Sequence, residues 1–212
     1  MIKMECSGAQ NPLQECIKGN EKLEIITDDC CESPRTWDNL TVIVAIKNNH
    51  NDIGDIQVNS SEELRELLED KKAKFAMPLY IYEHSGMSLK CFEDKIPKYP
   101  YNDQWDAGCI GMVYTTKKLL KESGLFNSTK KEIIEYMKAE VATYSNWCNG
   151  DCYGFRLSEV SECDKCNQVE DKEIDSCYGF LGWDHDMNGL YDAVLENSKV
   201  FKSYKDIEEH LS

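Results

Sequence analysis

The tetrapeptide Cys152-Tyr153-Gly154-Phe155 recurs later in the chain as Cys177-Tyr178-Gly179-Phe180. Aromatic residues in strand-like segments of this kind build the core and pair across strands. The sequence between the two copies contains a second pattern, Cys163-Asp164-Lys165-Cys166. The repeat therefore predicts a β-hairpin whose two copies face each other and whose long tip carries the paired cysteines.

Hydrophobic patterning outside the hairpin predicts an α+β fold, with a mixed, mainly antiparallel sheet, a long packed helix and a C-terminal hairpin subdomain. Strand-like runs occupy residues 22–27, 41–47, 78–83 and 105–115. Ser60-Ser61-Glu62-Glu63 is typical of a capping box at the start of a helix that ends near residue 71. Further helices are predicted at residues 117–123, 189–197 and 204–211, and the longest begins with Asn127 or Ser128 as its cap. The mixed order of strands and helices favours α+β over a doubly wound fold.

The length of 212 residues suits one domain with an appended subdomain. We expect a flexible N-terminal segment at residues 1–20, an α+β core at 21–147, and a hairpin with a cysteine knuckle and C-terminal helices at 148–212, packed on the core. The longest apolar run, residues 42–46, is too short to cross a bilayer, so no membrane partner is expected. Residues 1–19 lack the pattern of a secretory signal, which predicts a cytoplasmic location.

Acidic residues dominate the charge, with 39 Asp and Glu against 24 Lys and Arg and a net charge of −15. Direct binding to nucleic acid is not expected, because it requires basic side chains that neutralise phosphates. An acidic surface can instead occupy the basic groove of an enzyme that handles nucleic acid, whereas the alternative is charge that only maintains solubility. The carboxylates chosen as the candidate binding surface lie in an early loop and in the hairpin: Asp28, Asp29, Glu32 and Asp38, and Glu170, Asp171, Glu173 and Asp175.

Eleven cysteines are present, and in a reducing cytosol we expect free or metal-bound thiols rather than a disulfide framework. Cys163 and Cys166 have the spacing of two adjacent zinc ligands. With Cys148 and Cys152 they would form a four-thiolate structural zinc site, and the alternative is a reduced pair in an acidic surface loop. Two further residues at the far end of the hairpin are the other candidates for completing the site: Cys177 and His185.

Catalytic motifs are weak in this sequence. His84 follows a strand with Glu83 beside it, but adjacent residues on a strand point to opposite faces, so these two do not form a dyad. The chain has no G-x-S-x-G nucleophile motif and no phosphate-binding glycine pattern. Asp184-His185-Asp186 resembles a metal cluster only in composition and is interpreted as a solvated acidic turn.

Several motifs occur in a fixed order between residues 27 and 183: ESPRTWDNL (32–40), MPLYIYEHSGM (77–87), WDAG (105–108), EVxTY (140–144), GDCYGF (150–155) and DSCYGFLG (175–182). In these motifs the chain resembles a widespread, largely uncharacterised protein family of bacteriophages, plasmids and integrated mobile elements. It departs from the family pattern at residues 48–52, where a more basic segment is expected. Residues 48–54 and the strand at 79–83 also give it a faint similarity to the acidic antirestriction proteins of conjugative elements, which mimic DNA.

Charge and resemblance together lead to one functional hypothesis and two alternatives. The hypothesis is an anti-defence protein of a phage or mobile element that inhibits a host defence nuclease, either a CRISPR effector or a restriction enzyme, through an acidic surface that mimics nucleic acid. The first alternative is a zinc-knuckle adaptor that binds a replication or transcription protein. The second is a small hydrolase or nuclease that uses His84.

Overall fold

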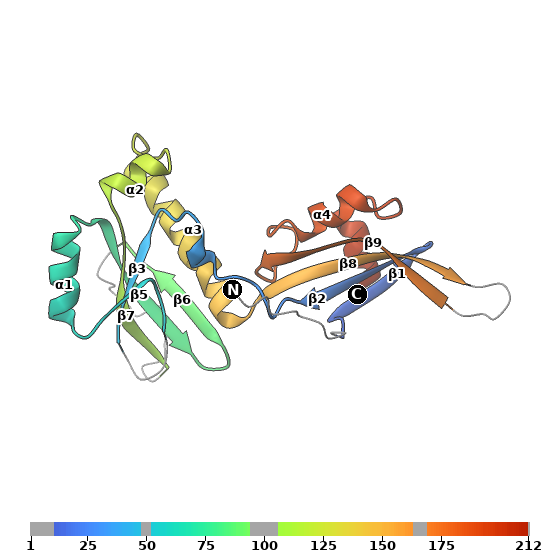
Figure 1. Ribbon diagram of the computed structural model, residues 1–212, viewed down its shortest axis with the longest axis horizontal. Coiled ribbons are helices and arrows are strands. Elements are labelled where there is room, and N and C mark those ends of the chain that lie inside the picture. The colour runs from blue at the N-terminus through green and yellow to red at the C-terminus, as the bar shows by residue number, and fades with distance from the viewer. Residues whose placement is uncertain (1–10, 48–51, 94–105, 163–168, 212) are drawn as a thin grey trace, which may run out of the picture. The chain divides into compact units, whose positions relative to one another are not determined.

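The structure is a computed structural model that describes residues 11–47, 52–93, 106–162 and 169–211 (Figure 1). The chain divides into two compact units. Unit 1 comprises Met1–Glu32 and Gly150–Ser212, and unit 2 comprises Ser33–Asn149. Each unit contains a sheet and helices, and the sheets are mainly antiparallel, which confirms the predicted α+β class.

Unit 1 is built on a four-stranded antiparallel sheet in the order β1-β2-β8-β9. Two helices, α4 and α5, contribute to the core on one face of this sheet, where they meet buried residues such as Leu23 and Phe155 (Figure 1). The opposite face carries Lys22 and Glu24 of β2 and Arg156 and Ser158 of β8, together with apolar residues such as Ile26. The element bounds are β1 Gln14–Lys18, β2 Glu21–Thr27, β8 Cys152–Glu162, β9 Val169–Leu181, α4 Leu190–Asn197 and α5 Tyr204–Leu211.

The two copies of the repeated tetrapeptide face each other across the β8–β9 hairpin, as predicted. Tyr153 pairs with Phe180, and Gly154 pairs with Tyr178. The register shifts between these two pairs, and Gly179, with φ of 93°, lies at the resulting bulge. A side chain at position 154 would place its Cβ 2.3 Å from the Tyr178 ring, so glycine is required there. The tip that carries Cys163 and Cys166 lies outside the described residues.

Unit 2 contains a five-stranded sheet in the order β4-β3-β7-β5-β6, in which only the β3–β4 pair is parallel among the described strands. The long helix α3 covers one face, and α1 lies on the other (Figure 1). Gly111 allows β3 and β7 to pair closely, since a Cβ there would meet the Val44 carbonyl oxygen. The bounds are η1 Pro34–Thr36, β3 Val42–Ile46, β4 Ile56–Val58, α1 Ser61–Asp70, β5 Lys74–Glu83, β6 Met87–Cys91, β7 Ala107–Thr115, α2 Lys117–Glu122 and α3 Lys130–Asn149.

Side-chain caps fix the starts of the two main helices of unit 2. The Ser60 hydroxyl accepts a hydrogen bond from the Glu63 N–H at 3.2 Å, which confirms the predicted start of α1, and the Glu63 carboxylate in turn accepts from the Asn59 N–H at 2.7 Å. At α3 the Thr129 hydroxyl accepts from the Glu132 N–H at 3.3 Å, while the Glu132 carboxylate accepts from the Thr129 N–H at 2.7 Å. The predicted cap of α3, Asn127 or Ser128, is therefore wrong, because a second capping box places the start at Thr129.

The units do not follow the ranges that we expected from the sequence. Residues 1–32 belong with the C-terminal part of the chain rather than with residues 33–149, because β2 pairs with β8 along its whole length. Within the expected flexible segment, Gln14–Lys18 forms β1. Among the described helices, none has the length and apolar character needed to cross a membrane.

Candidate functional site

The acidic charge of the chain is concentrated in unit 1. The residue ranges of unit 1 contain nine Lys and Arg and 22 Asp and Glu, a net charge of −13, whereas those of unit 2 contain 15 and 17, a net charge of −2. An acidic surface must therefore be sought in unit 1. Seven of the eight carboxylates predicted to form it belong to unit 1, and Asp38 belongs to unit 2.

A band of charged side chains lies on the face of the unit 1 sheet opposite α4 and α5, which we call the open face. Lys22 Nζ lies 3.2 Å from Glu24 Oε1, 3.5 Å from Asp171 Oδ2 and 3.6 Å from Glu15 Oε2. Arg156 Nε donates to Glu24 Oε2 at 2.8 Å, and this hydrogen bond lowers the pKa of Glu24 despite the opposing effect of burial. The buried carboxylate is therefore neutralised, and the exposed acids carry the negative charge of this face.

The four predicted hairpin carboxylates divide between two faces of β9. Asp171 and Glu173 alternate along the strand opposite Val160 and Ser158, so both lie on the open face. Glu170, one position before Asp171, lies on the opposite face of β9. A register shift after Glu173 then places Asp175 opposite the core residue Leu157, where Asp175 accepts a hydrogen bond from Asn197 of α4 at 2.8 Å. The structure therefore brings together only Asp171 and Glu173 from this set.

The early-loop carboxylates have different environments. Asp28 Oδ1 accepts from the Cys30 N–H at 3.1 Å, and the Asp28 N–H donates to the Cys152 carbonyl at 2.8 Å, so Asp28 forms the turn that follows β2. Asp29 and Glu32 are exposed in the same segment. Asp38, by contrast, lines a pocket of unit 2. The early loop is thus divided between the units and does not form one acidic patch within either of them.

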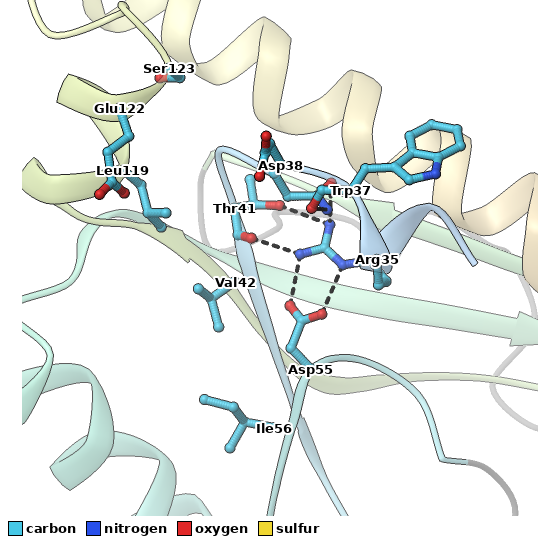
Figure 2. Close-up of a pocket in the computed structure, with 11 residues that line it drawn as sticks. Arg35, Trp37, Asp38, Thr41, Val42, Asp55, Ile56, Leu119, Glu122 and Ser123 are labelled. Carbon is cyan, nitrogen blue, oxygen red and sulfur yellow. Dashed lines mark hydrogen bonds and ion pairs between the residues drawn. The ribbon is translucent and has the colours of Figure 1, made fainter. Parts of the chain in front are cut away.

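The pocket that contains Asp38 has a volume of about 720 Å³ (Figure 2). Its wall includes Trp37, whose side chain is 53% exposed, and the carboxylate of Glu122 on α2. The other lining residues come from the loop before β3, from β3 and β4, and from α2: Arg35, Asn39, Thr41, Val42, Asp55, Ile56, Leu119 and Ser123. Acidic, aromatic and aliphatic groups thus border the same hollow.

Arg35 forms the base of this pocket, but its donors are already used (Figure 2). Its guanidinium donates to both carboxylate oxygens of Asp55, at 2.9 and 2.7 Å, and to Asn39, the Thr41 hydroxyl and the Thr41 carbonyl. Glu140 on α3 accepts from the N–H groups of Leu40 and Thr41 at 2.7 and 3.0 Å. The motif ESPRTWDNL therefore builds a structural clamp, and Arg35 has no donor left for an anionic ligand.

A histidine–aspartate pair lies at the end of the unit 2 sheet. His84 Nδ1 is 2.9 Å from Asp106 Oδ2, and the His84 side chain is 67% exposed. The partner of His84 is thus not its neighbour Glu83, which sequence reasoning had rejected, but Asp106, which lies 22 residues away and was not predicted. The signal that could have found it is strand pairing, since the Glu83 N–H donates to the Asp106 carbonyl. Such a pair orients an imidazole for acid–base work.

The cysteines predicted to bind zinc have separate surroundings where they are described. Cys148 belongs to unit 2 and contacts Tyr144, and burial raises the pKa of its thiol to about 11. Cys152 belongs to unit 1, where burial raises its pKa and its thiol interacts with Cys31. In the described part of the chain no group of three or more metal-binding side chains occurs. Because Cys163 and Cys166 lie outside it, structural zinc stays a prediction.

Two further sequence interpretations can be compared with the structure. Cys30 is disulfide-bonded, so the expectation of free or metal-bound thiols is wrong at that position.

His185 is not solvated: it is 9% exposed, and its ring lies 5.1 Å from that of Tyr153 and 5.6 Å from that of Tyr191. Its neighbour Asp184 accepts from the Met187 N–H at 3.1 Å, as expected for a turn residue. The alternative zinc ligand Cys177 is exposed on β9.

Comparisons with known proteins identify no relative of this chain. No protein-family model, no curated protein and no solved structure matches it.

Proposed function

We propose that this protein is an anti-defence protein of a phage or mobile element, and that it inhibits a nucleic-acid-targeting enzyme of its bacterial host, a CRISPR effector or a restriction enzyme. In this proposal it acts in the host cytoplasm. Unit 1 occupies the basic channel that normally binds nucleic acid. The observation that carries the proposal is the concentration of charge, since unit 1 has a net charge of −13 and unit 2 of only −2.

The open face of unit 1 supplies the contact surface in this proposal. Asp171 and Glu173 are exposed there, and their alternation along β9 separates them by about 7 Å. Lys22 and Arg156 fix the inner carboxylate of Glu24. Lys22 also lies 3.5 Å from Asp171, so the lysines and arginines of a target would replace this ion pair, which is partly exposed and costs little to break.

Charge reversal on the open face tests the proposal. The double variant Asp171→Lys, Glu173→Lys should weaken binding and inhibition by at least tenfold, since four charge units change in a contact made by electrostatic attraction. The matched control is Glu66→Lys, Glu69→Lys, which makes the same charge change on the exposed surface of α1 in unit 2. Far-UV circular dichroism verifies that both variants fold.

The measurement is an affinity pull-down with a panel of purified CRISPR and restriction effectors, treated with nuclease and repeated over a salt series. The proposal is supported if the pull-down captures an effector that added DNA, RNA or salt releases. The wild-type protein should then inhibit the nuclease activity of that effector, and the open-face variant should not. Equal inhibition by both variants would show that the open face is not the contact surface. Absence of any effector partner would overturn the inhibitor hypothesis.

A second candidate function rests on the pair formed by His84 and Asp106. Its 2.9 Å contact and the exposed imidazole favour a small hydrolase or nuclease as the alternative. The variants His84→Ala and Asp106→Asn should both abolish activity on model nucleic-acid or ester substrates if this function is correct. Activity that survives in both variants would exclude the pair from catalysis. The zinc-knuckle adaptor has no supporting observation among the described residues.

A further inference from the structure

Five lysines line a single pocket of unit 2, although the chain as a whole is strongly acidic. The pocket has a volume of about 600 Å³. Its lining consists of Lys71, Lys72, Lys74, Thr116, Lys117 and Lys118. The net charge of −15 therefore conceals a local surface of the opposite sign.

Two segments of the chain meet to form this lysine pocket. The first is the turn between α1 and β5, and the second is the start of α2, which directly follows β7. The pairing of β5 with β7 holds them together, because Lys74 lies opposite Thr115 in the register. The two groups of lysines are separated by more than 40 residues in sequence, so the cluster is a product of the fold.

The backbone at Lys72 shows that lysine is not the residue that local structure favours there. Lys72 has φ of 52° and follows the last turn of α1, with its N–H donating to the Glu69 carbonyl and the Ala73 N–H donating to the Leu68 carbonyl. Glycine is the usual residue at this left-handed position, because a Cβ is unfavourable there. The positive charge of a lysine is favourable at the C-terminus of α1, but the left-handed backbone itself favours glycine.

The start of α2 is also unfavourable for lysine. Lys117 and Lys118 occupy its first turn, which contains no acidic residue. Positive side chains near a helix N-terminus are disfavoured by the helix dipole. On the α2 side the sequence thus places cationic residues where they lower the stability of the helix, and on the α1 side it places Lys72 in a backbone conformation that favours glycine.

Nearby carboxylates neutralise only part of this charge. Lys71 pairs with Asp70 at 3.4 Å and Lys118 with Glu122 at 3.7 Å, and both pairs are exposed. Within the described residues, Lys72, Lys74 and Lys117 form no ion pair. Three cationic groups therefore converge on the hollow without a carboxylate partner.

We propose that the lysine pocket binds a run of closely spaced phosphate groups. Lysine ammonium groups bind phosphates as point charges, and several in one hollow suit a ligand with several negative charges. The lining contains no aromatic side chain that could stack on a base, so the pocket recognises phosphates without reading base identity. Two sources supply this chemistry: the backbone of a nucleic-acid strand, or a free polyphosphate.

This inference goes beyond the proposed function, because it requires no defence enzyme and uses no residue of the open face. It also changes the expectation drawn from net charge, that the chain does not contact nucleic acid directly. The number of counterions released depends on how many phosphates the lysines of the pocket neutralise. The acidic residues of unit 1 do not change that number.

The test measures binding of the full-length protein to a fluorescein-labelled single-stranded oligonucleotide by fluorescence anisotropy in a phosphate-free buffer. We expect binding that weakens with salt, with a slope of log K against log salt of about −2 to −3.5 for three to five phosphate contacts. The double variant Lys72→Glu, Lys117→Glu should bind at least tenfold more weakly. The matched control Lys130→Glu, Lys131→Glu changes the charge equally at exposed positions of α3 that do not line this pocket and should bind within twofold of wild type.

A second variant separates binding from folding. Lys72→Gly should raise the melting temperature, because glycine suits the left-handed backbone at this turn, while it weakens the binding of the oligonucleotide. A protein that becomes more stable and binds less well cannot have lost affinity through unfolding. Unchanged affinity in Lys72→Gly and in the double glutamate variant would overturn the proposal.

Inorganic tripolyphosphate distinguishes the two sources. If tripolyphosphate displaces the labelled oligonucleotide at micromolar concentration and does not bind the glutamate variant, the ligand is a free polyphosphate. If tripolyphosphate displaces the oligonucleotide only at concentrations where an equal ionic strength of simple salt does the same, the ligand is a nucleic-acid strand. If neither probe binds the wild-type protein at low salt, the pocket is not a phosphate site.

Discussion

The two units of this protein use similar elements in opposite ways. Unit 1 covers one face of its sheet with α4 and α5 and carries ion pairs on the open face, and its net charge is −13. Unit 2 covers both faces of its sheet with α1 and α3, and with a net charge of −2 it collects lysines in one pocket. The total charge of a chain is therefore a poor guide to what its separate surfaces can bind.

The largest expected effect comes from the core of unit 1. Phe155→Ala removes a fully buried ring and should lower the free energy of unfolding of that unit by about 3–5 kcal/mol. Hydrogen exchange measured by mass spectrometry should show lost protection in β2, β8 and β9 and retained protection in unit 2. Phe126→Ala, at a side chain that is 48% exposed, is the control. Equal loss in both units would mean that they unfold together.

Loss of the Arg35 clamp should give the corresponding result in unit 2. The Arg35 side chain is 9% exposed, so Arg35→Ala leaves Asp55 without its bidentate partner and should cost about 3 kcal/mol. The change should appear in denaturant unfolding and in hydrogen exchange of β3 and β4. Lys138→Ala breaks an exposed pair with Glu135 and should cost less than about 0.5 kcal/mol. A clamp variant as stable as this control would contradict our interpretation of the motif.

A smaller effect is expected at the start of α1. Ser60→Ala removes the hydroxyl that accepts from the Glu63 N–H and should destabilise unit 2 by about 1 kcal/mol. The melting temperature, measured by circular dichroism, reports the change. Ser61→Ala lies one residue further on, within the first turn, and should be nearly neutral. If Ser60→Ala and Ser61→Ala have the same melting temperature, the Ser60 cap contributes nothing measurable to the stability of α1.

The smallest effect is a pH dependence confined to unit 1. Burial lowers the pKa of His185 below its usual value of 6.5, so the unfolded chain binds this proton more readily than the folded chain. The contribution of His185 to stability is therefore complete above about pH 6.5 and decreases as the pH falls below that value. Melting curves between pH 7.5 and 5.5 should show this decrease in the wild type and a weaker one in His185→Phe. The lowered pKa values of Glu24 and Asp206 act only at lower pH.

Local sequence signals predicted local structure well. The repeated tetrapeptide predicted that its two copies face each other, because the same aromatic pattern occurs in both strands. The Ser60 box predicted the start of α1, because its interacting groups lie three residues apart. The short strands β1, β4 and β6 were not predicted. At five, three and five residues they are too brief for a clear alternation.

Long-range contacts explain what the sequence could not show. The pairing of β2 with β8 joins residues more than 120 positions apart and defines unit 1, but no local pattern indicates that partner. The contact between His84 and Asp106, and the convergence of Lys74 with Lys117, depend likewise on the pairing of β5 with β7. For the predicted acidic surface, the decisive event was a bulge near Ile174 that separates Asp175 from Asp171 and Glu173.

Strand β9 has one more consequence, for the behaviour of the protein in concentrated solution. It stands at the edge of the unit 1 sheet, is 13 residues long and exposes Val169, Ile174 and Tyr178. Edge strands of this length recruit other strands and lead to aggregation unless charges prevent it. The interspersed carboxylates repel a second copy at neutral pH, and they lose this ability as the pH approaches the isoelectric value of about 4.7. We therefore expect the carboxylates of β9 to limit aggregation through this edge strand, a role that does not depend on the binding of a host enzyme.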